Sequence, residues 1–381
     1  MINRRQFLTR ISLASAAAVL SKPAFSYPDQ NAIDYVTVET AHGRIRGLRT
    51  EGVNIFRGIP YAGKVSGDRR FRRPAALEPW TGVRDALRLG NPAIQPPKQT
   101  YGLNEPDPAE DCLFLNVWTP ANDNRKRPVM FYNHGGGFST GSGGSVSQDG
   151  ANLARFFDVV VVETNHRLGL MGFLFLDDIG GSDYTGSGNN GMLDIADGLA
   201  WVNRNISSFG GDPSNVMIFG ESGGGAKTSC LYAMPAAAPY FNKASIESGP
   251  GVRMTPRDVA AQTTAMLLKE LNIDRQNWKK LLDVPVSTLL EMQGKLPSLA
   301  ARHDSNNKKR GIMESSPGGF SPVVDGVALP AHPFDPVAPE ISKNKPLIVG
   351  WNEDEFTFFG MMSGDKSIFN ADFETLTAKM K

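Results

Sequence analysis

Short apolar runs alternate along the chain with longer segments in which apolar residues recur at helical spacing. Residues 159–163 form the clearest strand, four valines and a glutamate, as expected for a strand buried inside a sheet. Residues 192–208 follow a helical period instead. This alternation predicts an α/β fold in which helices cover both faces of a mostly parallel sheet. The other expected strands are 35–39 and 44–49, joined as a hairpin, 53–59, 112–118, 128–133, 215–218 and 346–351, and a helical cap or insertion is expected over 255–299.

The expected strand at 215–218 is followed at once by a glycine-rich turn and by a segment that can continue as a helix. The turn, residues 220–224, reads Gly-Glu-Ser-Gly-Gly and is a G-x-S-x-G pattern between strand and helix. A sharp turn of this kind strains the serine backbone, and flanking glycines remove the side chains that would clash. We therefore predict that Ser222 is a nucleophile, the alternative being a glycine-rich loop with an incidental serine.

A second glycine-rich segment, residues 134–138, reads His-Gly-Gly-Gly-Phe and directly follows the expected strand at 128–133. A hydrolase that forms a tetrahedral oxyanion needs backbone N–H groups aimed at it, and glycines let the backbone approach closely. We predict that Gly136 and Gly137 donate to the oxyanion and that Gly223, which follows the nucleophile, gives the third N–H group. His134 is expected to shape the loop rather than to act as the base.

The N-terminus has the pattern of a targeting segment rather than of a folded element. Arg4 and Arg5 precede an apolar run at 11–20, and small residues at 24 and 26 fit a cleavage site. We predict a twin-arginine signal peptide at 1–26, so the export machinery of that route is an expected partner and the mature protein is periplasmic or secreted. The apolar run is too short to span a bilayer, so no stable membrane anchor is expected.

Composition and net charge bear on which classes of partner are expected. The chain has 381 residues, 40% of them hydrophobic, and a net charge of +1, which is ordinary for a globular protein. A nearly neutral chain gives no reason to expect nucleic acid or an anionic membrane as a partner. The only cysteines, Cys112 and Cys230, are too few for a disulfide framework, and we expect both to be unpaired.

The two glycine motifs occur in a fixed order with several shorter motifs. On these residues the chain resembles the type-B carboxylesterases, the α/β-hydrolase family that includes cholinesterases and bacterial esterases. The resemblance implies a carboxylic ester hydrolase that acts on small-molecule esters through a serine nucleophile and an acyl-enzyme, with no metal and no organic cofactor. The shorter motifs are Phe-Arg-Gly-Ile-Pro-Tyr-Ala at 56–62, Glu-Asp-Cys-Leu-Phe-Leu-Asn at 110–116, Asn-His-Arg at 165–167, Gly-Asn-Asn-Gly at 188–191, Phe-Gly-Gly-Asp-Pro at 209–213 and Glu-Ser-Gly at 247–249.

The same resemblance assigns the acidic residues. Residues 349–356 resemble the segment that carries the family's triad acid, and the matching position is Glu355, with Glu353 and Asp354 as its competitors. Phe356 departs from the pattern, because the family usually has glycine there. Glu221, beside the nucleophile, resembles a second carboxylate of the family that tunes the local charge without belonging to the triad.

The base is left unassigned. In this fold the histidine follows the acid, whereas all five histidines here precede Glu355. The expected domain, residues 27–381, is therefore an α/β hydrolase that lacks the family's C-terminal segment. His303 or His332 would have to fold back to serve as the base. The alternative function is a catalytically incomplete binding protein, a pseudoenzyme or fragment without the triad histidine.

Overall fold

The computed structural model describes residues 34–97, 105–303 and 316–355, together with positions 357, 361, 372 and 374. The signal peptide expected at 1–26 lies outside the described residues and stays a prediction. The compact unit that begins at Tyr35 carries the fold. Within the described part of the chain, no helix combines the length and the apolar character needed to cross a membrane.

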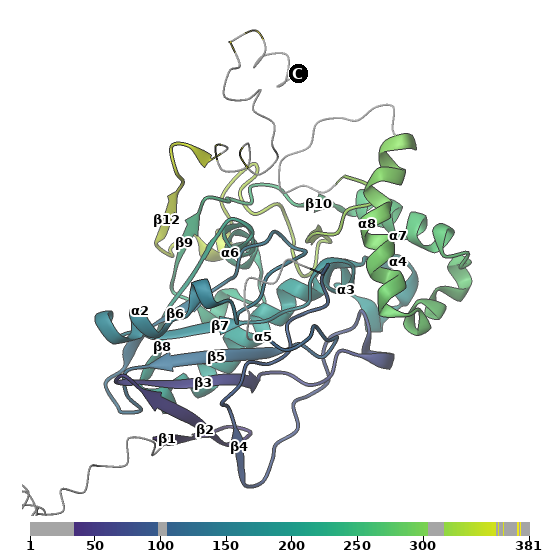
Figure 1. The fold of residues 1–381 in the computed structure, drawn as a ribbon. Coiled ribbons are helices and arrows are strands. Elements are labelled where there is room, and N and C mark those ends of the chain that lie inside the picture. The colour runs from purple at the N-terminus through teal and green to yellow at the C-terminus, as the bar shows by residue number, and fades with distance from the viewer. Residues whose placement is uncertain are drawn as a thin grey trace, which may run out of the picture. The chain divides into compact units, whose positions relative to one another are not determined.

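A mixed sheet of ten strands forms the centre of this unit (Figure 1). Its first strands pair antiparallel, and the strands from β7 onward pair parallel. The expected α/β sheet is confirmed, with its parallel part where the candidate site lies. In spatial order the strands are β1 (Tyr35–Thr40), β2 (Gly43–Thr50), β3 (Val53–Pro60), β5 (Phe114–Thr119), β7 (Val160–Thr164), β6 (Arg127–Tyr132), β8 (Gly211–Glu221), β9 (Lys243–Glu247) and β12 (Leu347–Gly350), while β4 (Val83–Asp85) pairs with β2.

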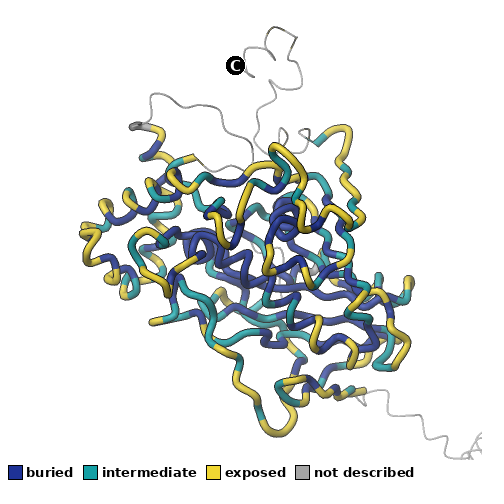
Figure 2. The backbone as a smooth tube through the Cα atoms, turned by 180° about the vertical axis from the view of Figure 1, so that it is seen from behind, coloured by how far each residue is buried: buried dark blue, intermediate teal, exposed yellow. Residues whose placement is uncertain are grey.

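Helices cover both faces of the sheet, as the alternation predicts. On one face, α5 (Asn190–Asn205) and α6 (Gly223–Ala233) pack over side chains such as Phe131, Val162 and Ile218, which are at most 1% exposed. On the other face, α2 (Ala151–Phe157) packs over Trp118 and Val161. Figure 2 shows the buried backbone concentrated in the central strands and the helices next to them. The sheet therefore presents the carboxyl ends of its parallel strands from a rigid core.

The cap expected over 255–299 is confirmed as a helical region. It contains α7 (Arg257–Glu270), the 3-10 segment Arg275–Asp283 and α8 (Val286–His303). These elements share a separate apolar cluster with α3 (Gly169–Phe173) and with residues next to α4 (Asp177–Gly180). The buried members of that cluster are Phe71, Leu170, Met171, Leu174, Leu176, Tyr184, Leu267, Leu268, Ile273, Trp278, Leu281, Leu289 and Leu296. A small second sheet, β10 (Thr255–Pro256) with β11 (Val323–Val324), joins the cap to the segment after α8.

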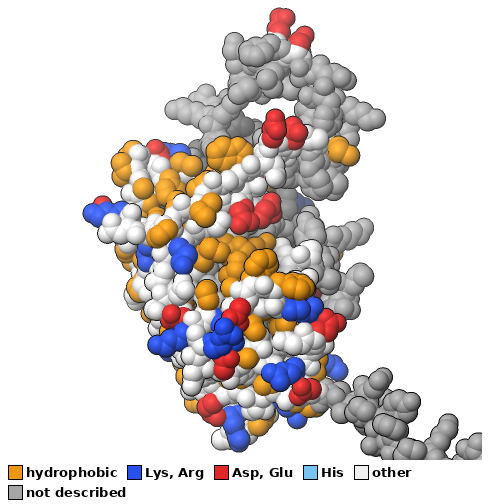
Figure 3. Space-filling model, turned by 90° about the vertical axis from the view of Figure 1, so that its left-hand side faces the viewer, with side chains coloured by type: hydrophobic (Ala, Val, Ile, Leu, Met, Phe, Trp, Pro, Cys, Tyr) orange, Lys and Arg blue, Asp and Glu red, His pale blue; other side chains and the backbone are white. Residues whose placement is uncertain are grey.

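The side of the molecule that carries α2 and β12 exposes apolar side chains. Figure 3 looks onto this side and shows hydrophobic side chains gathered near its middle, with acidic side chains beside them. Phe156 and Phe157 of α2 are 70% and 69% exposed, and Ile348 of β12 and Trp351 just after it are 68% and 71% exposed. Cys112 and Cys230 are both buried and free, which confirms the expectation that they are unpaired.

Candidate active site

The candidate nucleophile lies in a strained turn between β8 and α6. Ser222 follows the last residue of β8 and precedes the first residue of α6, and its backbone angles are φ 57° and ψ −122°. A residue with a side chain rarely adopts this conformation, which costs on the order of 1–3 kcal/mol. Hydrogen bonds on both sides hold it there. The Ser222 N–H group donates to the Glu247 carbonyl at 2.8 Å, and the Ala226 N–H group donates to the Ser222 carbonyl at 3.1 Å.

The elbow, residues 220–224, packs directly against the end of β6. A Cβ atom placed on Gly220 would lie 2.5 Å from the carbonyl oxygen of Asn133, and one on Gly224 would lie 2.0 Å from the same atom. Real side chains do not approach a carbonyl this closely, so only glycine fits at either position. The geometry therefore agrees with the interpretation that these glycines remove side chains that would clash. The group they would clash with lies at the end of β6, the strand that leads into residues 134–138.

The glycine loop, residues 134–138, turns immediately beside Ser222. Gly136 and Gly137 have positive φ angles of 86° and 59°, and the Thr140 N–H group closes the turn on the Gly136 carbonyl at 3.1 Å. A Cβ atom on Gly223 would lie 2.2 Å from the backbone nitrogen of Gly137, so loop and elbow are in contact.

The predicted oxyanion donors are available. Among the described residues, the N–H groups of Gly136 and Gly137 donate no hydrogen bond to another protein group. Gly223 is the first residue of α6, and N–H groups in the first turn of a helix have no partner within that helix. The structure thus brings all three predicted donors to one place beside Ser222, where a negatively charged oxygen could accept from them.

The candidate acid approaches from the end of β12. Glu355 accepts a hydrogen bond at 2.7 Å from the Asn352 N–H group. The nearby Ser248 side chain, followed by the hydrogen bond from Asn352, lowers the pKa of Glu355. Ser248 directly follows Glu247, whose carbonyl accepts the hydrogen bond from the Ser222 N–H group. The proximity of Glu355 to Ser248 therefore brings the candidate acid close to the elbow. Its competitors Glu353 and Asp354 are exposed.

Glu221 belongs to the elbow and lies beside the glycine loop, close to the candidate acid. Partial burial raises its pKa, and the charges of Glu355 and Glu247 raise it further. A Cβ atom on Gly135 would lie 3.4 Å from Glu221 Oε2. A carboxylate at this place adds negative charge beside the site, and the role of Glu221 in tuning that charge stays a prediction.

The histidine side chains that the structure describes near the site make contacts with other groups. His134 and His166 are both 1% exposed and stack with ring centroids 4.5 Å apart. Burial lowers the pKa of each well below its usual value, so both rings are neutral. His332 accepts the Met254 N–H group at 3.1 Å, and the side chain of His303 lies outside the described atoms. Among the described residues, Ser222 Oγ forms no hydrogen bond to any histidine.

Sequence reasoning assigned no role to two buried charged groups near the site, although Arg167 belongs to the Asn-His-Arg motif at 165–167. Arg167 and Asp194 form a fully buried ion pair at 2.7 Å that fixes the segment after β7 to α5. Lys227 of α6 is 0% exposed and donates to the His134 carbonyl at 2.8 Å. The only sequence signal for Lys227 is its position: a lysine inside an otherwise small and apolar helix that directly follows the elbow.

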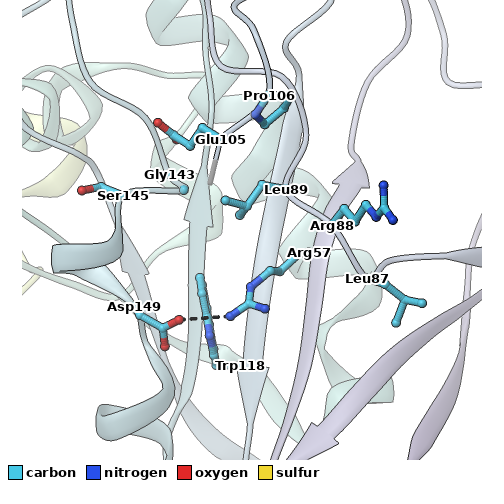
Figure 4. A pocket seen from close by; sticks show the side chains of 11 residues that line it. Arg57, Leu87, Arg88, Leu89, Glu105, Pro106, Trp118, Gly143, Ser145 and Asp149 are labelled. Atoms are coloured by element: carbon cyan, nitrogen blue, oxygen red, sulfur yellow. Dashed lines mark hydrogen bonds and ion pairs between the residues drawn. The ribbon is translucent and has the colours of Figure 1, made fainter. Parts of the chain in front are cut away.

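A cavity of about 630 Å³ lies elsewhere in the fold (Figure 4). The Arg57–Asp149 ion pair, 3.2 Å long, crosses in front of Trp118 within it. None of the predicted site residues lines this cavity. It is therefore separate from the candidate active site, and Arg57 of β3 is held by its ion pair with Asp149.

Comparisons with known proteins agree with this geometry. A model of the carboxylesterase family matches residues 34–380. The para-nitrobenzyl esterase of Bacillus subtilis is 38% identical over 325 residues, 84% of this chain and 63% of that protein. The fumonisin B1 esterase of Sphingopyxis macrogoltabida is 33% identical over 358 residues, 92% of this chain and 63% of that protein. A solved carboxylesterase of Geobacillus stearothermophilus matches with a TM-score of 0.76 and 37% identity, over 90% of this chain and 68% of that chain. This chain thus spans less than two thirds of the length of these two curated relatives.

Proposed function

The chain belongs to the carboxylesterase family and has its α/β-hydrolase fold, and from this premise we propose that it hydrolyses carboxylic esters of small molecules through Ser222. One observation carries the proposal. A serine held in a strained strand-to-helix turn lies beside the free N–H groups of Gly136 and Gly137. A hydroxyl in such a turn is exposed to a substrate carbonyl, and the N–H groups are positioned for the oxygen on which negative charge develops.

The reaction has two half-steps. Ser222 Oγ attacks the ester carbonyl and loses its proton to a base, and the negatively charged oxygen accepts from Gly136, Gly137 and Gly223. The alcohol leaves, an ester between Ser222 and the acyl group remains, and water hydrolyses it by the same route. The base stays unassigned in this chain; a histidine supplied there would be oriented by Glu355, which would also stabilise its charged form. Glu221 tunes the charge at the site without taking the proton.

The decisive experiment is covalent labelling of the purified chain with a fluorophosphonate, followed by intact mass. We expect one label per chain, lost in Ser222→Ala and kept in Ser214→Ala, which removes an exposed serine near the end of β8 opposite to the elbow. Turnover of a para-nitrobenzyl ester and of acyl, aryl and polycarboxylate esters then defines the substrate class. A folded chain that takes up no label would contradict the proposal and support the catalytically incomplete alternative.

We also propose that residues 1–26 direct export by the twin-arginine route. The support is the Arg4-Arg5 pair followed by an apolar run and a small-residue cleavage site. In a bacterial host, the protein should reach the periplasm or medium with the mass of a processed chain whose first residue lies near Tyr27. The double variant Arg4→Lys, Arg5→Lys should stay in the cytoplasm at full length. Export that is unchanged in this variant would contradict the proposal.

A further inference from the structure

Lys227 is a buried amine without a carboxylate partner. Its side chain is 0% exposed, and among the described residues it forms no ion pair. Its neighbours are the rings of His134 and His166, which burial keeps neutral. Burial also lowers the pKa of Lys227 to about 7. Because an ammonium group without a counter-ion is costly to bury, the hydrogen bonds that it makes must offset much of that cost.

The main hydrogen bond of Lys227 joins the nucleophile helix to the glycine loop. Its Nζ atom donates to the carbonyl of His134 at 2.8 Å and lies 3.4 Å from His134 Nδ1. That carbonyl belongs to the peptide that enters Gly135, at the start of the glycine loop. Lys227 lies on α6, which begins at Gly223. One side chain therefore couples the element that carries one predicted oxyanion donor to the loop that carries the other two.

Thr228, the next residue of α6, makes a similar connection to Asn133, the residue just before the glycine loop. Asn133 Nδ2 donates to Thr228 Oγ1 at 2.9 Å, and the Asn133 N–H group donates to the Phe219 carbonyl at 2.8 Å. Two consecutive helix residues thus hold two consecutive residues at the end of β6. Asn133 is also fixed by the sheet, whereas among the described residues the His134 carbonyl accepts only from Lys227. Loss of the Lys227 bond would leave the peptide between His134 and Gly135 without its partner.

We propose that Lys227 is a positioning residue for the candidate oxyanion loop: its amine fixes the His134–Gly135 peptide and thereby aims the N–H groups of Gly136 and Gly137 at the substrate oxygen above Ser222. The positioning role rests on the proposed function of the loop in ester hydrolysis. The amine does not act on the substrate or on Ser222, because it is committed to the His134 carbonyl. A displacement of about 1 Å at such a loop lowers a rate by roughly 100-fold.

The test compares Lys227→Met and Lys227→Gln with Lys345→Met. Lys345 is the matched control, because its Nζ atom also donates to backbone carbonyls, those of Ala238 and Phe241, and touches none of the site residues. Methionine fills the volume of Lys227 without a donor, and glutamine keeps a donor. The first readout is the second-order rate of fluorophosphonate labelling, separated into its binding and bond-forming constants. The second is deuterium uptake in peptides that cover residues 133–141.

We expect Lys227→Met to lower the bond-forming constant by about 10-fold to 100-fold with little change in the binding constant. Uptake at 133–141 should rise several-fold in the same variant. Lys227→Gln should recover part of both effects, and Lys345→Met should show neither. If Lys227→Met does not fold, Lys227→Gln alone must show a slower bond-forming step and raised uptake at 133–141.

Two outcomes separate this inference from the proposed function. A labelled wild type whose bond-forming constant and loop uptake are unchanged in Lys227→Met would overturn the positioning role and leave the esterase proposal intact. An unlabelled wild type, with uptake at 133–141 raised only in the Lys227 variants, would refute the proposed function and keep the role of Lys227 in ordering the loop.

Discussion

The two sides of the candidate site are built in different ways. The nucleophile side, residues 133–138 and 219–224, is held by backbone contacts so close that a single added carbon atom would clash. The acid side, residues 346–355, ends beyond β12 in a segment where Trp351 is 71% exposed and a Cβ atom added to Gly350 would meet no described atom within 4 Å. One side is therefore fixed by packing, and the other by a few hydrogen bonds to Glu355.

This difference separates two ways of positioning a reactive group. On the nucleophile side, strain at Ser222 is held in place by hydrogen bonds and by the core beneath it, so the geometry exists before any substrate arrives. On the acid side, the position of Glu355 depends on the Ser248 side chain and on one backbone N–H group. Changes on the nucleophile side should therefore affect folding and chemistry together, whereas changes on the acid side should affect chemistry alone.

The largest effect is expected from an added methyl group on the nucleophile side. Gly224→Ala places a Cβ atom 2.0 Å from the Asn133 carbonyl oxygen, within the core, and we expect a loss of unfolding free energy of about 4 kcal/mol or more, or no folded protein. Gly350→Ala is the matched change on the acid side, where no described atom lies within 4 Å of the added Cβ atom, and it should stay within about 0.5 kcal/mol of wild type. Denaturant unfolding measures both. Similar losses in the two variants would remove the distinction between the two sides.

The sequence predicts the nucleophile side well because its geometry is encoded locally. A strained serine needs small neighbours, and those neighbours are visible as glycines at 220, 223 and 224. The acid side was predicted from family resemblance alone, because its geometry depends on the contact between Glu355 and Ser248, more than 100 residues earlier in the chain. Strand β9 was not predicted, because Lys-Ala-Ser-Ile-Glu at 243–247 has little β propensity and is only half buried in the sheet. Lys227 was missed because a lysine in a helix usually reaches solvent, and only the packing shows that α6 is buried on all sides.

The second largest effect is expected in the dependence of the unfolding free energy on pH. His134 and His166 are neutral in the folded protein because burial lowers the pKa of each, whereas in the unfolded chain they take up protons near pH 6.5. The unfolded state therefore binds more protons as the pH falls below about 6.5, and each histidine should remove roughly 1 kcal/mol of unfolding free energy per pH unit. This stability is present above pH 6.5 and is lost on acidification.

The variant His166→Leu isolates this contribution. Neither ring nitrogen of His166 has a protein partner among the described residues, so leucine leaves no broken hydrogen bond. Burial raises the pKa of Glu163, which acts in the opposite direction on acidification, so the informative quantity is the difference between wild type and variant. Unfolding free energies at pH 7, 6 and 5 should converge between the two proteins or cross in favour of His166→Leu. A difference that is independent of pH would show that His166 takes up its proton at the same pH in the folded and unfolded states.

A smaller effect should reveal the strain at Ser222. Both Ser222→Gly and Ser222→Ala abolish labelling, but only glycine adopts a φ of 57° with a ψ of −122° without strain. The strain relieved exceeds the extra entropy of glycine in the unfolded chain, so Ser222→Gly should be more stable than Ser222→Ala by about 1 kcal/mol. At Ser214, where φ is not positive, the glycine variant should be the less stable of the pair. Equal stability of the two Ser222 variants would mean that the turn relaxes when the serine is removed.

The smallest effect on stability is expected at the acid. Glu355→Gln should leave the denaturant midpoint where it is in wild type, because the carboxylate is open to solvent and its hydrogen bonds are compatible with an amide oxygen. Fluorophosphonate labelling should nevertheless slow by roughly 100-fold or more, as when a triad acid loses its charge. The controls are Glu353→Gln and Asp354→Asn, which neutralise the two neighbouring carboxylates and should label at the wild-type rate.

The pattern across these three variants decides whether the acid side takes part in the chemistry. Slow labelling in Glu355→Gln alone would show that two hydrogen bonds are enough to place a catalytic acid beside a preformed nucleophile. Slow labelling in Glu353→Gln or Asp354→Asn instead would move the acid to that residue, and the contact between Glu355 and Ser248 would then serve only to hold the segment. Equal labelling in all three would leave the packed nucleophile side as the sole source of reactivity among the described residues.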